Sequence, residues 1–317
     1  MERFDVATLK LGEDVTEFYM VRSIAVRIGS NGKKYLDVLL SDKTGDISCK
    51  KWDVSDSDEI MFAQIKEGDV VKIQGKVKDF NNQLQMTITQ MRKATDDDPV
   101  DRESLVKAAP LSAEEMFEYI LSVANDIEDE DFKKVSVKVL EDNKSKLAYY
   151  PAAQRNHHAE KSGLLYHMTR MIKAGLKLWE VYESLNKDLL VTGIIIHDIE
   201  KIREIESDTQ GVASGYSFEG QMLGHLIQGV KYIDKLSSEL DIPFEKAILM
   251  EHMVLSHHYE PEFGSPKKPL FPEAEMLHYI DMIDARMYDM EEALSNIKKG
   301  DFSDRVWTLD NRRLYKF

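Results

Sequence analysis

The first 94 residues carry short runs of alternating apolar and polar positions, a pattern typical of β-strands. Between the third and fourth runs, residues 55–68 begin with polar residues and then place apolar ones at helical spacing. Five strands with one helix in that place is the order of an OB-fold, a small barrel that binds its ligands on the face of strands 2 and 3. The five runs, separated by turn segments such as SNGK, DKTG and FNNQ, are residues 17–28, 33–42, 45–52, 69–80 and 83–91.

Beyond this part the apolar positions recur at helical spacing. The first such segment opens with Ser112 and has Glu115 three residues later, a capping-box arrangement. Further helices are predicted for residues 131–147, 163–185, 188–204, 219–238, 243–258 and 272–298. Between these two parts, residues 95–111 carry two prolines and a run of acids, which predict a linker. The sequence therefore predicts an OB-fold at residues 1–94, a linker at 95–111 and an all-helical domain at 112–317.

Composition narrows the class of protein. Of 317 residues, 43% are hydrophobic and 31% charged, as in an ordinary folded chain. Cys49 is the only cysteine, and the sequence shows neither a signal peptide nor an apolar run of the ~20 residues that span a bilayer. We therefore expect a cytoplasmic protein that binds no membrane. Residues 1–94 hold 15 basic and 15 acidic residues, so the net charge of −15 arises in the remainder, where solvated helix surfaces are favoured over a metal site as its cause.

All nine histidines lie between residues 157 and 278, in the helical half. His167 shares a helix face with apolar residues, and His197 and Asp198 end the segment LLVTGIIIHD. That segment is apolar all round, so we expect it to be buried. A buried carboxylate is costly without a partner, and a metal ion would supply one.

The pattern continues on later helices. His225 lies in EGQMLGHLIQGV, His257 and His258 lie together in MVLSHHYE, and Asp281 follows in LHYIDMIDARM. Imidazole nitrogens and carboxylate oxygens suit Zn, Mn, Fe or Ni, and Mg less well. One histidine on an apolar face is usually a core residue, but four such sites with a buried His-Asp pair favour metal binding.

The series His167, His197-Asp198 and Asp281 resembles the H…HD…D signature of HD-domain metal-dependent phosphohydrolases. The segments NHHAEKSGLLYH, HDIEK, YSFEGQMLGH, MVLSHHYEPEFGSPKKP and EAEMLHYIDMIDARM extend the match. With the preceding OB-fold and the closing LDNRRLYKF, nearly the whole chain resembles the YhaM type of 3′–5′ exoribonuclease. Glu200 departs from the HD pattern, in which many members have glycine.

The resemblance implies a phosphodiesterase that removes nucleotides from the 3′ end of single-stranded RNA, with single-stranded DNA as a second candidate substrate. It also implies two divalent ions, Mn²⁺ first, with Co²⁺, Fe²⁺, Zn²⁺ and Ni²⁺ as alternatives. Asp198 would bridge the ions and activate water between them. The assigned ligands are His167, His197, Asp198 and Asp281 for one ion, and Asp198, His225 and His257 for the other, with His258 as the alternative to His257.

Other polar residues near these ligands are candidates for catalysis. Lys201 stands three residues after the bridging aspartate and could reach a phosphate oxygen, with a solvated lysine as the equal alternative. His157 and His158 could bind phosphate or protonate a leaving group, and His158 is the preferred candidate over a surface or capping role. For Asp284 with Arg286, an exposed ion pair is favoured over a supporting role at the site.

The predicted barrel carries basic and aromatic residues where an OB-fold binds its ligand. Lys33 and Tyr35 begin the second strand, Lys50 and Trp52 end the third, and Phe80 lies at the last hairpin. Single strands are commonly held by aromatic stacking in a basic groove, so we predict these five residues as nucleic-acid contacts. Core packing is the alternative for the tyrosine and the tryptophan, and solvation for the lysines.

Two other functions fit the sequence. One is an HD phosphohydrolase of free nucleotides or cyclic dinucleotides, in which the barrel regulates or assembles the enzyme. The other is a non-catalytic RNA-binding adaptor, which the retention of every predicted ligand opposes. The predicted partner is single-stranded RNA, and the sequence leaves a homo-oligomer open.

Overall fold

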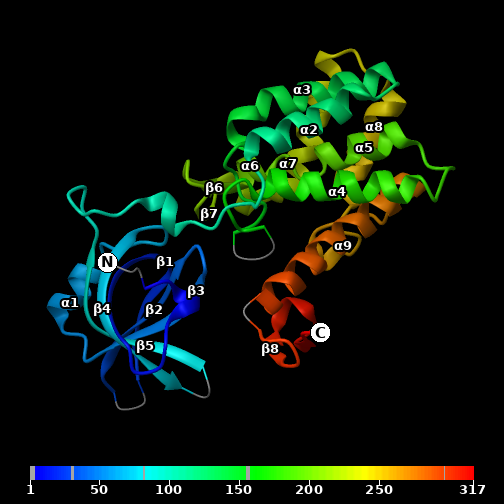
Figure 1. Cartoon of the computed structure of the whole chain (residues 1–317). Helices are drawn as coiled ribbons and strands as arrows, with labels where there is room; N and C mark the ends of the chain where they lie inside the picture. The colour runs from blue at the N-terminus through cyan, green and yellow to red at the C-terminus, as the bar shows by residue number, and fades with distance from the viewer. Residues whose placement is uncertain (1–3, 30–31, 81–82, 155–157, 296) are drawn as a thin grey trace. The chain divides into compact units, whose positions relative to one another are not determined.

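The computed structural model describes residues 4–29, 32–80, 83–154, 158–295 and 297–317 (Figure 1). The chain divides into two compact units, Met1–Ala108 and Ala109–Phe317. None of the helices in the described ranges combines the length and hydrophobicity that a bilayer span requires.

The first unit is a closed five-stranded barrel. Its strands follow the order β1-β2-β3-β5-β4, and the parallel pairing of β3 with β5 closes it. Helix α1 (Asp56–Phe62) lies between β3 and β4 in the chain, so the predicted OB-fold is confirmed. The strands are β1 (Asp14–Ile28), β2 (Lys34–Asp42), β3 (Gly45–Trp52), β4 (Val70–Phe80) and β5 (Gln83–Lys93).

Alternation along β2 separates the inside of the barrel from its outside. Leu36, Val38 and Leu40 are at most 1% exposed and form part of the core. Cys49 of β3 joins them, and burial raises the pKa of its thiol. A thiol held in its protonated form is a poor nucleophile, so this cysteine serves packing.

The second unit is built around helix α5 (Lys187–Ile196), in which every residue from Leu189 onward is buried. It packs against five other helices, which explains why its sequence is apolar all round. Figure 1 shows α2, α3, α4 and α8 gathered around α5, with α9 running away from them. Those five helices are α2 (Ala113–Asn125), α3 (Glu130–Leu147), α4 (Gly163–Trp179), α8 (Phe244–Ser256) and α9 (Pro272–Ser295); α7 (Phe218–Glu239) packs on α8.

The helical half departs from the predicted pattern at several points, and the helix predicted for residues 163–185 already ends at Trp179. The helix predicted for 188–204 ends at Ile196, and a short α6 (Lys201–Glu204) follows a turn. The apolar spacing runs through this turn because Ile199 and Ile202 also face the core, so periodicity could not reveal the break. Two hairpins were not predicted: β6 (Ile205–Ser207) with β7 (Ala213–Tyr216), and β8 (Phe302–Val306) with β9 (Arg312–Tyr315).

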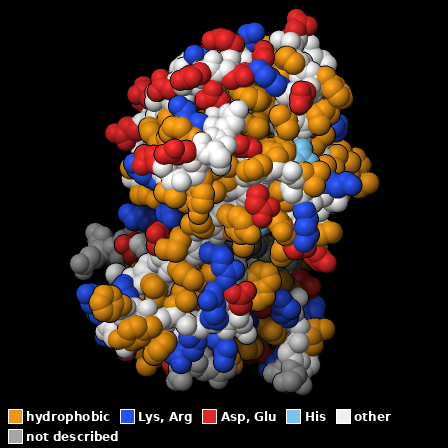
Figure 2. Space-filling model, turned by 90° about the vertical axis from the view of Figure 1, so that its right-hand side faces the viewer, with side chains coloured by type: hydrophobic (Ala, Val, Ile, Leu, Met, Phe, Trp, Pro, Cys, Tyr) orange, Lys and Arg blue, Asp and Glu red, His pale blue; other side chains and the backbone are white. Residues whose placement is uncertain are grey.

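The surface of the helical unit reflects its excess of acid. Figure 2 shows many Asp and Glu side chains on the surface. Acids on the outer faces of the helices, such as Glu114 and Glu118 of α2, are exposed. Solvated carboxylates on helices stay the favoured source of the net negative charge.

Candidate active site

His197 and Asp198 lie at the carboxyl end of the buried helix α5. His197 is the C-cap residue, and its Nδ1 donates to the carbonyl oxygen of Ile194 at 2.9 Å. A helix end leaves such carbonyls without an intrahelical donor, so the ring completes the helix. With its proton on Nδ1, the imidazole presents the Nε2 lone pair toward Asp198.

Helix α8 ends with the same arrangement. His257 is its C-cap residue, and its Nδ1 donates to the carbonyl oxygen of Val254 at 2.8 Å. The carbonyl of His257 accepts in turn from Nδ1 of His278 on α9, at 2.7 Å. The ring Nδ1 and the backbone carbonyl of His257 are therefore both hydrogen-bonded, and its Nε2 faces the site.

His225 owes its place to a kink in helix α7. Gly224 has φ 67° and ψ 161°, a conformation that a residue with a Cβ rarely adopts. The kink lets the backbone NH of His225 donate to Glu204 Oε1 at 3.0 Å, while its Nδ1 lies 3.0 Å from Glu204 Oε2. One carboxylate thus fixes both the backbone and the tautomer of this histidine.

Asp198 is the centre on which these rings converge. Its Oδ1 lies 3.4 Å from Nε2 of His225 and 3.6 Å from Nε2 of His257. Its Oδ2 lies 3.4 Å from Nε2 of His197 and 3.7 Å from Nε2 of His167. Because each oxygen faces a different pair of imidazoles, the carboxylate is placed to serve two neighbouring ligand sets.

Asp281 and Lys201 complete the inner cluster. Asp281 Oδ1 lies 3.3 Å from His167 Nε2, and Lys201 donates to Asp198 Oδ2 at 2.6 Å. Groups of ligand atoms that lie within 4.8 Å of one another include His167-His197-Asp198, His197-His257-Asp281 and Asp198-His225-His257-His258. The structure therefore brings together all six predicted metal ligands.

Several of these atoms are buried without a hydrogen-bond partner among the described residues: Nε2 of His197, His225 and His257, and Oδ1 of Asp198. Leaving buried polar atoms unpaired costs about 1–3 kcal/mol each, so four in one place require an explanation. Nitrogen and carboxylate oxygen donors are the set that Mn, Fe, Co, Ni and Zn prefer. The residues present fit a divalent cation.

Electrostatics keep Asp198 and His257 in the protonation states that metal binding needs. Burial opposes the charge of Asp198, but the neighbouring charges, Lys201 first, outweigh it and hold the pKa of this carboxyl well below its usual range. Burial lowers the pKa of His257 to about 4, so that ring is neutral. The pKa of Lys201 is raised despite burial because Asp198 lies beside it, so the lysine stays cationic.

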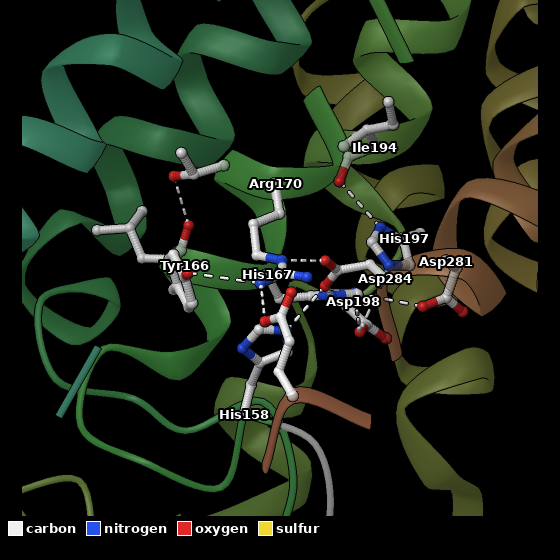
Figure 3. A network of polar contacts seen from close by, with 12 residues as sticks. His158, Tyr166, His167, Arg170, Ile194, His197, Asp198, Asp281 and Asp284 are labelled. Atoms are coloured by element: carbon white, nitrogen blue, oxygen red, sulfur yellow. Dashed lines mark hydrogen bonds and ion pairs between the residues drawn. The ribbon is translucent and has the colours of Figure 1, made fainter. Parts of the chain in front are cut away.

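A buried network supports His167 from its far side (Figure 3). Asp284 Oδ2 lies 2.7 Å from Nδ1 of His167 and 2.8 Å from Nε2 of His158, and Arg170 Nε donates to Asp284 Oδ1. Burial lowers the pKa of His167, but Asp281 and Asp284 outweigh it and raise the value to about 9. The same negative field that favours a proton there favours a cation.

Two predictions are corrected by this network. Asp284 is only 5% exposed and binds His167, whereas Arg286 pairs with Asp310 at 2.6 Å, so the favoured exposed pair between Asp284 and Arg286 is wrong. His158 was predicted to face the substrate, but its ring is fully buried behind His167. His157 lies outside the described residues.

Some contributors were missed from the sequence. Glu204, which holds His225, follows the HD pair by six residues, and no spacing rule links it to a histidine on the next helix. Arg170 is one turn after His167, but its partner Asp284 lies 114 residues away. In the sequence, the only sign of the role of Arg170 is its position one helical turn after the predicted ligand His167. His258 stays an alternative ligand by proximity, and its Nδ1 lies 2.7 Å from the carbonyl of Phe263.

The predicted nucleic-acid contacts lie on the outside of the barrel. Tyr35 faces Trp52 across β2 and β3, with ring centroids 5.1 Å apart, and Nζ of Lys50 lies 5.3 Å from the Tyr35 ring. Trp52 is 51% exposed and Phe80 61%, so neither fills the core. The exposed Lys33 donates to Asp53. Packing inside the barrel is thereby excluded for the tryptophan.

Comparisons with known proteins agree with both units. A model of the OB-fold nucleic acid binding domain matches residues 20–94, and a model of the HD domain matches residues 164–286. An HD domain with this histidine and aspartate cluster defines a metal-dependent phosphohydrolase. The 3′-5′ exoribonuclease YhaM of Geobacillus sp. (strain WCH70) is 38% identical over 307 residues, which is 97% of this chain and 93% of that protein. The chain belongs to the YhaM family.

Two solved structures that resemble the chain each match about a third of it. The second OB-fold domain of replication protein A from Methanococcus maripaludis is 17% identical over 32% of this chain and 100% of its own, with a TM-score of 0.24. Pot1pC of Schizosaccharomyces pombe, bound to single-stranded DNA, is 16% identical over 31% of this chain and 91% of its own, with a TM-score of 0.25.

Proposed function

We propose that this chain is a 3′–5′ exoribonuclease that shortens single-stranded RNA and releases nucleoside 5′-monophosphates, with single-stranded DNA as a second substrate. The observation that carries the proposal is the buried cluster around Asp198, in which three imidazole Nε2 atoms and one carboxylate oxygen lack partners among the described residues. The 38% identity to a YhaM exoribonuclease supports the polarity and the choice of RNA.

Two divalent ions, Mn²⁺ first, are the proposed cofactors. His167, His197, Asp198 and Asp281 would hold one ion, and Asp198, His225 and His257 the other. Bound ions would supply the Lewis acidity that makes water reactive toward phosphorus at neutral pH and stabilises the charge that develops on the phosphate.

The residues around the cluster have distinct roles in the proposal. Lys201, held cationic against Asp198, keeps that carboxylate ionised and oriented, and it offers positive charge to a phosphate oxygen. Asp284 orients His167, with Arg170 and His158 holding Asp284 from behind. On the barrel, Tyr35 and Trp52 bind the bases of the strand by stacking.

Attack of water on phosphorus with departure of the 3′ oxygen leaves the phosphate on the 5′ carbon of the released nucleotide. The ribose 2′-hydroxyl takes no part in such a step. Strands with deoxyribose or 2′-O-methyl ribose at the scissile bond should therefore retain some cleavage, whereas a 2′-hydroxyl mechanism would lose it and form cyclic phosphates.

The test incubates 3′-labelled and 5′-labelled oligoribonucleotides with the full chain and Mn²⁺, with and without a chelator. We expect the 3′ label to leave first as a nucleoside 5′-monophosphate and the chelator to stop the reaction. Chromatography of early products decides the chemistry. Cyclic or 3′-phosphate products, or early release of the 5′ label as a mononucleotide, would overturn the proposal.

The matched variant is Asp198→Asn. Asparagine keeps the volume and a partner for Lys201, whereas alanine would leave that buried lysine unpaired. We expect hydrolysis and the number of bound Mn²⁺ ions to fall, with activity reduced by about 100-fold or more, beyond the usual cost of losing a residue that only supports a ligand. Asp234→Asn, on the exposed side of α7, is the control. Unchanged metal content and activity in Asp198→Asn would refute the ligand assignment.

A further inference from the structure

The closing segment of the chain is a basic element in an acidic unit. Residues 298–317 carry six cations and three acids, although residues 95–317 carry the whole net charge of −15. The cations are Lys298, Lys299, Arg305, Arg312, Arg313 and Lys316; the acids are Asp301, Asp304 and Asp310. The segment folds as the hairpin of β8 and β9, and the proposed chemistry gives it no role.

One face of this hairpin combines aromatic and basic side chains. Phe302 pairs with Tyr315 and Arg305 with Arg313, so all four project from the same side of the two strands. All four are exposed, and Phe302 and Tyr315 are 54% and 51% exposed. Ser303, on the opposite side, is buried. The hairpin thus has a packed side and an open side of different chemistry.

The open side is ordered by its own contacts. The ring centroids of Phe302 and Tyr315 lie 5.1 Å apart, and the guanidinium of Arg313 lies 5.5 Å from the Phe302 ring. Arg305 Nη1 donates to the carbonyl of Asn311 at 3.0 Å, and Arg313 Nε donates to the carbonyl of Ser303 at 2.9 Å. A carbonyl orients a guanidinium without neutralising it, so both arginines keep a net charge for a ligand.

The hairpin is anchored to the helix that carries the active-site aspartates. Arg286 on α9 donates to Asp310 at 2.6 Å, and Lys316 donates to the carbonyl of Leu294 at 2.8 Å. Arg286 is two residues after Asp284, so the turn of the hairpin is tied to α9 within one helical turn of the site. The hairpin thus lies along the second half of α9, with its turn nearest the site and the Phe302–Tyr315 pair at its other end.

We infer that this face of β8 and β9 is a second binding surface for single-stranded RNA, with bases stacked on Phe302 and Tyr315 and phosphates bound by Arg305 and Arg313. The inference rests on the proposed exoribonuclease function and extends it. Exposed rings beside guanidiniums for which the described residues show no ion pair are the combination that single strands select, and the positive charge of the guanidiniums complements phosphate. The rest of this unit is acidic and disfavours phosphate, so the basic face of the hairpin is the part of the unit that favours a nucleic-acid strand.

The test measures binding of a 5′-labelled oligoadenylate to the full chain in chelator, and hydrolysis in Mn²⁺. Loss of one stacking ring costs about tenfold in affinity, so Phe302→Ala and Tyr315→Ala should each raise the dissociation constant by about that factor. Phe302→Tyr and Tyr315→Phe keep a ring and should restore affinity. Phe244→Ala, an exposed phenylalanine at the start of α8, is the matched control and should change nothing.

Arginine variants test the phosphate contacts separately. Arg305→Gln with Arg313→Gln should reduce the slope of log affinity against log salt by about 1.4, which is about 0.7 for each lost phosphate contact on a single strand. This readout does not depend on how the aromatic variants fold.

The outcomes separate this inference from the proposed function. Wild-type protein that neither binds nor cleaves single strands overturns both. Wild-type protein that cleaves from the 3′ end, with aromatic and arginine variants of unchanged affinity and salt slope, overturns the hairpin surface alone. A changed oligomeric state with unchanged RNA affinity would assign the face to a second copy of the chain instead.

Discussion

At the scale of single residues, the orientation of each imidazole in the site depends on the group that its Nδ1 faces. His197 and His257 donate it to helix-end carbonyls, and His225 and His167 lie with Nδ1 against carboxylates. In every case Nε2 faces the cluster. Supporting partners of this kind fix ring orientation and raise ligand basicity, so they contribute to metal affinity without touching the ion.

Asp284→Asn tests whether the partner of a ligand's Nδ1 contributes to metal affinity. The amide removes the negative charge at Nδ1 of His167 while Arg170 keeps Glu291 as a partner. We expect Mn²⁺ affinity, measured by calorimetry, to fall about 10–100-fold with little change in melting temperature. The matched control is Arg286→Gln, which breaks only the pair with Asp310. Equal effects of the two variants on Mn²⁺ affinity would contradict the supporting role.

At the scale of elements, the ends and kinks of helices position the ligands. The break in α7 is the sharpest case, because Gly224 at φ 67° sets where His225 points. Gly224→Ala should destabilise the fold by about 1–3 kcal/mol, since φ 67° with ψ 161° is a conformation almost restricted to glycine, and it should weaken Mn²⁺ binding through the displaced ring. Urea unfolding and metal titration measure the two effects. Met222→Ala, exposed on the same helix, is the control, and a Gly224→Ala protein with unaltered metal affinity would refute the argument.

The start of helix α3 offers a test by pH. Asp129 caps this helix, and Lys246 of α8 donates to both of its oxygens, at 2.7 and 2.6 Å. Burial opposes the charge of Asp129, but the hydrogen bonds from Lys246 and from backbone NH groups outweigh it and hold its pKa below the ordinary value. A lowered pKa in the folded state means that the stabilisation is present above the ordinary carboxyl pKa and is lost as pH falls through the folded-state value.

Lys246→Gln should therefore lower the free energy of unfolding by about 1 kcal/mol at pH 7, and the difference from wild type should shrink toward pH 3. Urea unfolding across this range measures it. Lys177→Gln removes an exposed pair with Glu180 and should have almost no effect at any pH. If the difference in the free energy of unfolding between wild type and Lys246→Gln grew toward acid pH, the predicted direction of the pH dependence would be wrong.

At the scale of the whole molecule, the predicted contacts on the barrel and the predicted metal ligands lie in separate compact units. Trp52 is exposed on the barrel, and the six predicted ligands all lie in the second unit. Trp52→Ala should raise the dissociation constant for a long single strand about tenfold, because one stacking platform is lost. Its effect on hydrolysis of a dinucleotide should be much smaller. Ile60→Ala, equally accessible on α1, is the control, and equal losses on both substrates would assign the barrel a structural role.

The sequence by itself determined the barrel order, the position of its helix and most of the later helices, because these follow from periodicity and turn chemistry within short windows. It also singled out six candidate ligands, and the structure brings them together. Their types and spacing matched a known signature, and burial of the His197-Asp198 segment could be deduced from its apolar surroundings.

Tertiary structure decided what periodicity does not encode. The break after Ile196 lies in a run that faces the core throughout, so the pattern continues across it. The sequence favours an exposed pair between Asp284 and Arg286, because the real partners of Asp284, His167 and Arg170, lie 117 and 114 residues away along the chain. Which residues hold the ligands depends on contacts between distant segments, and those contacts form only when helices α4, α5 and α9 pack around one core.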